Sequence, residues 1–105
     1  MAERKIPQAK EAEKAVLGAA FLSKTALQKA CDELSSDAFY DEANKKIFEV
    51  LQELNDEQVP VDTTIVINKL NDKKILSQVG NVEYIMELID YGPSTSNVDY
   101  YIGIV

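Results

Sequence analysis

The sequence predicts an all-α fold, a compact bundle of about six short helices in a single domain that spans residues 1–105. Apolar residues recur through most of the chain at the i, i+3, i+4, i+7 spacing of an amphipathic helix. Several of these segments directly follow a residue type that caps helices. No segment clearly alternates apolar and polar residues with the period of two that a half-buried strand requires.

The first predicted helix runs from about Gln8 to Leu22, directly after Pro7. One face carries the small and branched apolar residues Ala12, Ala15, Val16 and Ala19. Leu17, Ala20 and Phe21 broaden that face, so we expect neighbours to contact this helix from more than one side.

The second predicted helix begins with Thr25 as its N-cap. Gln28 follows three residues later, which completes a capping box in which each side chain bonds the backbone N–H of the other residue. The apolar face that follows has helical spacing and consists of Leu27, Ala30, Cys31 and Leu34.

A break with at most one short turn is expected from Ser35 to Tyr40, where Phe39 and Tyr40 are predicted to anchor in the core. Asp41 is the expected N-cap of a third helix. Its buried face is predicted to consist of Ala43, Ile47, Phe48, Leu51 and Leu54.

The stretch Thr63–Ile67 is β-branched throughout and fits a strand as well as a helix by residue type. Asp62 stands at an N-cap position, and Val61 can pack on Val66 as a hydrophobic staple. Leu70 continues the Val66 face, and a lone strand would have no partner. These neighbours favour a helix.

Residues 71–81 are predicted to form a connector. Gly80 closes this connector, and Asn81 is the expected N-cap of a fifth helix. Tyr91, Gly92 and Pro93 should stop this helix. Its predicted buried face consists of Val82, Ile85, Met86 and Ile89.

A last helix is predicted after the capping pair Ser96 and Asp99, with Val98, Tyr101, Ile102 and Val105 at helical spacing. No stop signal follows it. We therefore expect a chain cut inside a helix of a larger protein.

Composition excludes several chemistries. The chain has no His and one Cys, which removes Ser-His and Cys-His catalytic pairs, His-bearing metal sites and internal disulfides. No glycine precedes Lys and Ser or Thr, so a P-loop is absent. No apolar run approaches the roughly 20 residues of a membrane span, and no secretory signal opens the chain. A cytoplasmic protein without a cofactor or metal is expected.

Net charge indicates the kind of partner. The chain carries 18 Asp+Glu against 11 Lys+Arg, a net charge of -7, and has no Lys or Arg after Lys74. Nucleic-acid surfaces gain affinity from cations that neutralise phosphates, so direct DNA binding is not expected. A basic protein surface is the better match.

Carboxylates recur on one face of the fifth helix, as Glu83, Glu87 and Asp90. A hard-metal site is conceivable there, but such rows usually face solvent or a partner. Glu49 and Glu53 form a weaker version of the pattern. Cys31 lies on an apolar face, which should keep its thiol protonated and unreactive.

Five blocks follow one another in a distinctive order: IPQAKEAEKAVLGAAFL (6–22), AFYDEANKKIFEVLQEL (38–54), PVDTTIVINKL (60–70), VGNVEYIMELID (79–90) and TSNVDYYIGIV (95–105). Together these blocks resemble the N-terminal domain of DnaB-type replicative DNA helicases. Each block alone is a weak signal, but together they span nearly the whole chain.

The resemblance implies the helical head of a collar domain, truncated before the family's helical hairpin. DnaB-type helicases are hexameric, ATP-driven motors whose ATP and Mg²⁺ bind a separate RecA-like domain. In that family the N-terminal domains form a trimer of dimers on which the C-terminal helicase-binding domain of primase docks. The resemblance thus implies a replication protein in which this domain organises the oligomer, docks primase and catalyses nothing itself.

Within the matching blocks, Glu11, Tyr84, Glu87 and Asp90 are the candidate partner-interface residues. Glu11 and Tyr84 lie beside apolar faces, and the two acids flank Tyr84 on the fifth helix. Tyr84 and Tyr100 fall off the apolar faces and are better interface candidates than Tyr101. The competing hypotheses are a helix-turn-helix-like DNA-binding module and a small carboxylate metalloenzyme.

Overall fold

The computed structural model describes the backbone of residues 7–91 and 98–105 and the side chains of residues 10–91 and 100–105. These residues contain helices and no strand, which confirms the all-α prediction. The helices are α1 (Pro7–Leu22), α2 (Lys24–Glu33), α3 (Glu42–Asp56), α4 (Thr63–Asp72), α5 (Asn81–Tyr91) and α6 (Val98–Ile104), with short 3₁₀ turns η2 (Ser36–Ala38) and η3 (Leu76–Val79).

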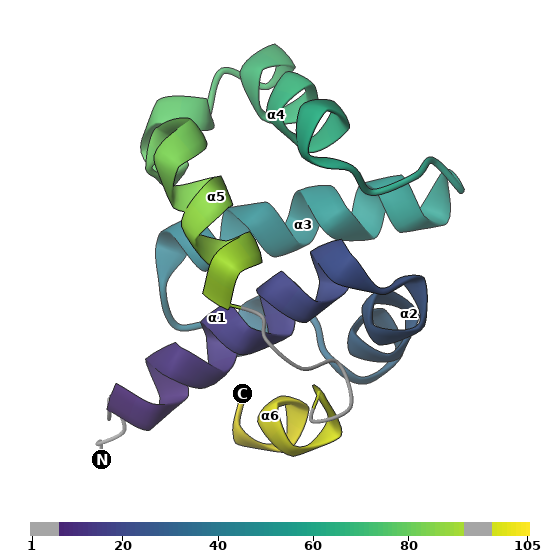
Figure 1. Cartoon of the computed structure of the whole chain (residues 1–105), viewed down its shortest axis with the longest axis vertical. Helices are drawn as coiled ribbons and strands as arrows, with labels where there is room; N and C mark the ends of the chain where they lie inside the picture. The colour runs from purple at the N-terminus through teal and green to yellow at the C-terminus, as the bar shows by residue number, and fades with distance from the viewer. Residues whose placement is uncertain (1–6, 92–97) are drawn as a thin grey trace.

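Helix α1 lies at the centre of the arrangement (Figure 1) and contacts α2, α3, α5 and α6. Its broad apolar face is accordingly buried, as predicted. Helix α3 lies between α1 and α4 and contacts both of them (Figure 1). The small side chains of α1 let the backbones of these four neighbouring helices approach it closely.

Most of the buried apolar side chains form one cluster to which all six helices contribute. Phe39 and Phe48 pack ring against ring, with centroids 4.7 Å apart and planes tilted by 32°. The predicted core residues Val16, Ile47 and Leu51 are each fully buried in the same cluster.

Two predicted N-caps are confirmed. Asp41 Oδ2 accepts a hydrogen bond from the Asn44 backbone N–H at 3.1 Å at the start of α3. Asp62 Oδ1 accepts from the Thr64 N–H at 2.8 Å at the start of α4. The β-branched stretch 63–67 is therefore helical, as its flanking residues indicated.

The predicted start of α2 is wrong by two residues. Ser23, not Thr25, is the N-cap, and its hydroxyl accepts from the Ala26 N–H at 3.2 Å. Ser23 is extended and its carbonyl accepts the first helical hydrogen bond, so Thr25 already lies in the first turn. Gln28 bonds Asp32 at 2.9 Å instead of completing a capping box.

The prediction that Tyr40 anchors in the core is also wrong, because Tyr40 is 79% exposed while Phe39 is buried. The chain is extended at Phe39. Successive side chains of an extended segment point in opposite directions, so only one of these two aromatic rings can enter the core.

Only part of the predicted face of α5 is buried. Ile85 is fully buried and Ile89 is half-buried against the core, as predicted, whereas Val82 and Met86 are 41% and 47% exposed. Leu88, which lay outside the predicted face, is fully buried. Apolar residues lie on two sides of this helix, and its packing on α1 decides which side is covered.

The entry to α5 requires a glycine. Gly80 has φ 94°, and a Cβ there would lie 2.7 Å from Tyr84 Cβ. The helix is assigned from Asn81, whose φ of 61° is not helical, and the Gly80 carbonyl accepts from the Tyr84 N–H at 3.3 Å. Gly80 thus allows Tyr84 to pack closely against the turn.

Helix α5 is described as far as Tyr91. Helix α6 forms as predicted, with Ile102 buried and Tyr101 and Val105 half-buried. The predicted stop residues Gly92 and Pro93 and the capping residue Ser96 lie outside the described residues, as does the Asp99 side chain. Within the described part of the chain, no helix is both long and apolar enough to cross a bilayer.

Candidate protein interaction face

Helices α1 and α5 pack side by side, and their polar side chains meet on one face. Lys14 Nζ donates a hydrogen bond to Glu87 Oε2 at 2.5 Å. The same ammonium lies 6.0 Å from the ring centroid of Tyr84 and 5.4 Å from that of Tyr91. Lys14 therefore joins an acid and two aromatic rings of α5 to α1 by an ion pair and cation–π contacts.

We call this set the α1–α5 face and define it as Glu11, Lys14, Tyr84, Glu87 and Tyr91. Glu11 belongs to it because its carboxylate contributes to a raised pKa of Tyr91, after the larger effect of burial and against the opposing charge of Lys14. The structure thus brings together three of the four candidate residues. The fourth, Asp90, is exposed one turn beyond Glu87 on α5.

Tyr84 is tied to the interior through its hydroxyl. The hydroxyl donates to Asn44 Oδ1 at 2.5 Å, and Asn44 Nδ2 donates to Glu13 Oε1 at 2.9 Å. The expectation that Tyr84 falls off the apolar faces is wrong, because its half-buried ring packs against the core. Only part of this side chain is open to a partner.

Glu13 is a buried carboxylate at the centre of this network. It is 2% exposed, and its Oε2 accepts from the backbone N–H of Tyr40 at 2.6 Å. Its Oε1 accepts from the Asp41 N–H at 3.4 Å as well as from Asn44, which is fully buried. Glu13 therefore ties α1 to the segment that starts α3.

Burial, followed by the carboxylates of Asp41 and Glu87, raises the pKa of the Tyr84 phenol. The hydrogen bond to Asn44 opposes this shift, and Glu13 adds a smaller increase. The phenol thus stays protonated and remains a hydrogen-bond donor at neutral pH.

Sequence reasoning missed Glu13 and Asn44 because it selected exposed polar positions. A usable signal was present for Glu13, since the residues three and four positions later, Val16 and Leu17, belong to the buried face. A carboxylate on a face that is otherwise apolar must find buried hydrogen-bond donors.

The exposed apolar residues of α5 were also missed. Val82 and Met86 lie one turn apart, and we call this pair the α5 apolar row. The acids Glu83, Glu87 and Asp90 are exposed on the same helix, which contains no Lys or Arg. An apolar pair next to carboxylates is a surface that suits a partner with apolar and basic side chains.

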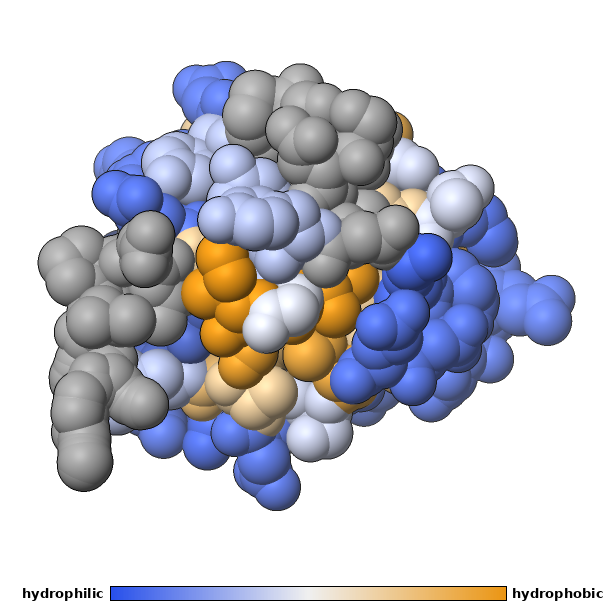
Figure 2. Space-filling view, turned by 90° about the horizontal axis from the view of Figure 1, so that it is seen from below, coloured by the Kyte–Doolittle hydropathy of each residue, from blue (hydrophilic) through white to orange (hydrophobic). Residues whose placement is uncertain are grey.

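A second exposed aromatic residue lies on α6. Tyr100 is 66% exposed, as expected, and its ring meets that of Tyr101 edge to face at 5.4 Å. The face that carries α6 shows an apolar area with hydrophilic side chains to its right and below it (Figure 2).

Burial raises the pKa of the Cys31 thiol from an ordinary 9.0 to about 11, with Asp56 and then Asp32 adding to the shift. The thiol should therefore be unreactive at neutral pH, as predicted from its position. Since the folded state holds this proton more tightly than the unfolded chain, the stability contribution is complete below pH 9 and falls as the pH rises toward 11.

We expect the rate of Cys31 alkylation by iodoacetamide to increase about tenfold per pH unit up to about pH 11. Replacing Asp56 with Asn should move this profile to lower pH. A rate that stops rising near pH 9 in the folded protein would contradict the burial of the thiol.

No three Asp, Glu, Cys or His side chains in the described residues are placed to hold one metal ion. The carboxylates of α5 are among the side chains to which this applies.

Comparisons with known proteins agree on one family. The family model for the DnaB-like helicase N-terminal domain matches residues 5–105. The replicative DNA helicase DnaB of Geobacillus stearothermophilus is 43% identical over 103 residues, which cover 98% of this chain and 23% of that protein. The replicative DNA helicase DnaC of Bacillus subtilis is 38% identical over the same shares.

A solved structure has the same fold. The crystal structure of the N-terminal domain of DnaB helicase from Mycobacterium tuberculosis matches with a TM-score of 0.85 and 30% identity. The match covers 90% of this chain and 68% of that chain.

Proposed function

The chain belongs to the family of DnaB-like helicase N-terminal domains, and on this premise we propose that it docks primase and helps to organise a helicase oligomer. It is the N-terminal domain of a replicative DNA helicase, a protein of DNA replication. The chain spans 23% of the length of the curated relatives named above, so the activity of the whole protein is part of the proposal.

One observation supports the docking role above the others, which is the exposed α5 apolar row next to Glu83, Glu87 and Asp90. Exposed Met is well suited to partner surfaces because it adapts its shape. The acids would attract a basic surface and set its register, while Val82 and Met86 would supply the apolar contact. The proposed partner is the C-terminal helicase-binding domain of primase.

We assign the motor functions to other parts of the helicase. ATP and Mg²⁺ would bind a RecA-like domain, where hydrolysis would drive unwinding, and the full-length protein would act as a hexamer in the cytoplasm. This domain would contribute contacts and no catalytic residue. Its net charge of -7 argues against direct DNA binding, so the helix-turn-helix alternative is not favoured.

We expect replacement of Met86 by Glu to weaken binding of the purified cognate primase domain at least about tenfold. The substitution removes an exposed apolar contact and would bury an unpaired carboxylate in the apolar part of the interface. Isothermal titration calorimetry measures the change directly.

Asn68→Glu provides the matched control, because Asn68 is exposed on α4 and the substitution adds the same charge away from α5. It should leave the affinity unchanged. Equal weakening by both variants, or no binding of the primase domain to the unaltered chain, would contradict the proposed docking.

A further inference from the structure

The hydrogen bonds that lead from Glu13 to Tyr84 can run in one direction only. A carboxylate accepts hydrogen bonds and donates none, so Glu13 Oε1 must face the donor group of the Asn44 amide, Nδ2, at 2.9 Å. The Oδ1 atom of Asn44 then faces Tyr84, and because this atom can only accept, the phenol must donate to it. We call these three side chains the Glu13–Asn44–Tyr84 network. Glu13 sets the orientation of the Asn44 amide, which in turn holds the Tyr84 hydroxyl.

The two inner members of this network are themselves held in place. Glu13 is 2% exposed and also accepts from the backbone N–H groups of Tyr40 and Asp41. Asn44 is fully buried in the first turn of α3, where its own N–H donates to the capping carboxylate of Asp41 at 3.1 Å. The position of the acceptor that meets the Tyr84 hydroxyl is therefore set by α1 and α3.

Tyr84 is held at its base, its ring and its hydroxyl. At the base, a Cβ on Gly80 would lie 2.7 Å from Tyr84 Cβ, so the side chain starts directly against the turn. Lys14 Nζ lies 6.0 Å from the ring centroid. The hydroxyl is the end of the side chain farthest from the backbone, and its bond to Asn44 is the directional contact of the three. This bond therefore decides the direction in which the ring points from α5.

The position of the Tyr84 ring affects the surface of the domain. Lys14 lies near this ring and near that of Tyr91, and it donates to Glu87, which is exposed. A Tyr84 ring that left Asn44 would remove one of the two aromatic contacts of the Lys14 ammonium and change the setting of its ion pair with Glu87. The network thus reaches the α1–α5 face, although the buried Asn44 is closed to any partner.

We propose that Asn44, oriented by Glu13, is a positioning residue for partner docking, because it fixes the Tyr84 ring and with it the surface of the α1–α5 face. The inference rests on the proposed primase docking and assigns a part in it to side chains that the partner does not touch. A ring that is already in place loses less conformational freedom on binding, so the effect appears in the affinity. The α5 apolar row lies outside the network, and the loss of affinity without Asn44 is therefore partial.

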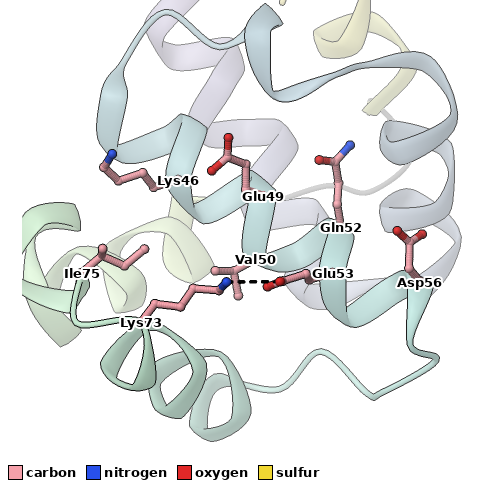
Figure 3. Close-up of a pocket in the computed structure, with 8 residues that line it drawn as sticks. All are labelled: Lys46, Glu49, Val50, Gln52, Glu53, Asp56, Lys73 and Ile75. Atoms are coloured by element: carbon pink, nitrogen blue, oxygen red, sulfur yellow. Dashed lines mark hydrogen bonds and ion pairs between the residues drawn. The ribbon is translucent and has the colours of Figure 1, made fainter.

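Controls for a substitution of Asn44 are available elsewhere in the chain. Figure 3 shows another part of α3, where Gln52 lines a groove of about 340 Å³ that no member of the network lines. Gln52→Ala removes an amide side chain from the same helix as Asn44→Ala does. Leu27→Ala removes a buried side chain from α2 and controls for a loss of stability alone.

The first measurement needs no partner. In the ¹³C-labelled chain, NOEs between the ring protons of Tyr84 and the side-chain protons of Lys14 report the position of the ring. We expect Asn44→Ala to weaken these NOEs and both control variants to preserve them. Unchanged NOEs in a folded Asn44→Ala variant would overturn the proposal.

The second measurement is a double-mutant cycle on the affinity for the helicase-binding domain of the cognate primase, followed by calorimetry. Tyr84→Phe keeps the ring and removes only the hydroxyl, so it tests the contact even where Asn44→Ala does not fold. Each variant should weaken binding about fivefold, and the double variant should bind no more weakly than either one alone. Urea unfolding verifies that each variant is folded.

The outcomes separate this role from the docking itself. Losses that add in the double variant, or an equal loss in Gln52→Ala or Leu27→Ala, would overturn the positioning role. Unchanged affinity in Tyr84→Phe, with binding by the unaltered chain intact, would overturn the positioning role alone. No binding by the unaltered chain would overturn the proposed docking.

Discussion

Replacement of Glu13 by Ala is expected to lower the free energy of unfolding by about 3 to 5 kcal/mol. The substitution leaves the backbone N–H groups of Tyr40 and Asp41 and the side-chain amide of Asn44 without their acceptor. Each buried donor without an acceptor costs about 1 to 3 kcal/mol. Urea unfolding followed by circular dichroism measures the loss.

Glu11→Ala is the matched control, since Glu11 lies two residues away on the same helix and is exposed. Its effect should stay within about 0.5 kcal/mol. Glu13→Gln should fall between the two, because the amide keeps one acceptor oxygen. Equal effects of the two alanine variants would show that the buried network does not stabilise the fold.

Replacement of Phe48 by Ala is expected to cost about 3 to 5 kcal/mol of unfolding free energy. Phe48 is fully buried and packs on the Phe39 ring, so its removal leaves a cavity at the junction of α3 and the η2 turn. Tyr40→Ala, at an exposed aromatic of the same segment, should cost less than about 1 kcal/mol. A larger loss for Tyr40 than for Phe48 would contradict the observed division of this segment between core and solvent.

The helices could be predicted from the sequence because apolar spacing and capping residues are signals that lie within each helix or directly before it. Asp41 and Asp62 mark the starts of α3 and α4 through side-chain bonds within three residues of themselves. Where two cap residues compete, as Ser23 and Thr25 do before α2, the local signal does not decide. The start then depends on where the chain leaves α1.

The face that a helix buries depends on neighbours far away in the chain. Helix α5 carries apolar residues on two sides, and its packing on the rest of the bundle buries Ile85 while Met86 stays exposed. The contacts of the candidate site likewise depend on residues that are far apart in the sequence. Glu11 and Glu87 could be selected as exposed acids, but the bond between Tyr84 and Asn44 joins residues 40 positions apart and has no local signature.

The most direct measurement of the proposed role is a binding footprint on the ¹⁵N-labelled chain after addition of the unlabelled helicase-binding domain of the cognate primase. We expect shifted or broadened amide signals to concentrate at Val82, Tyr84, Met86 and Glu87 and along the adjoining part of α1. A footprint confined to α2, α4 or α6, or an unchanged spectrum at saturating primase domain, would contradict docking through the exposed side of α5.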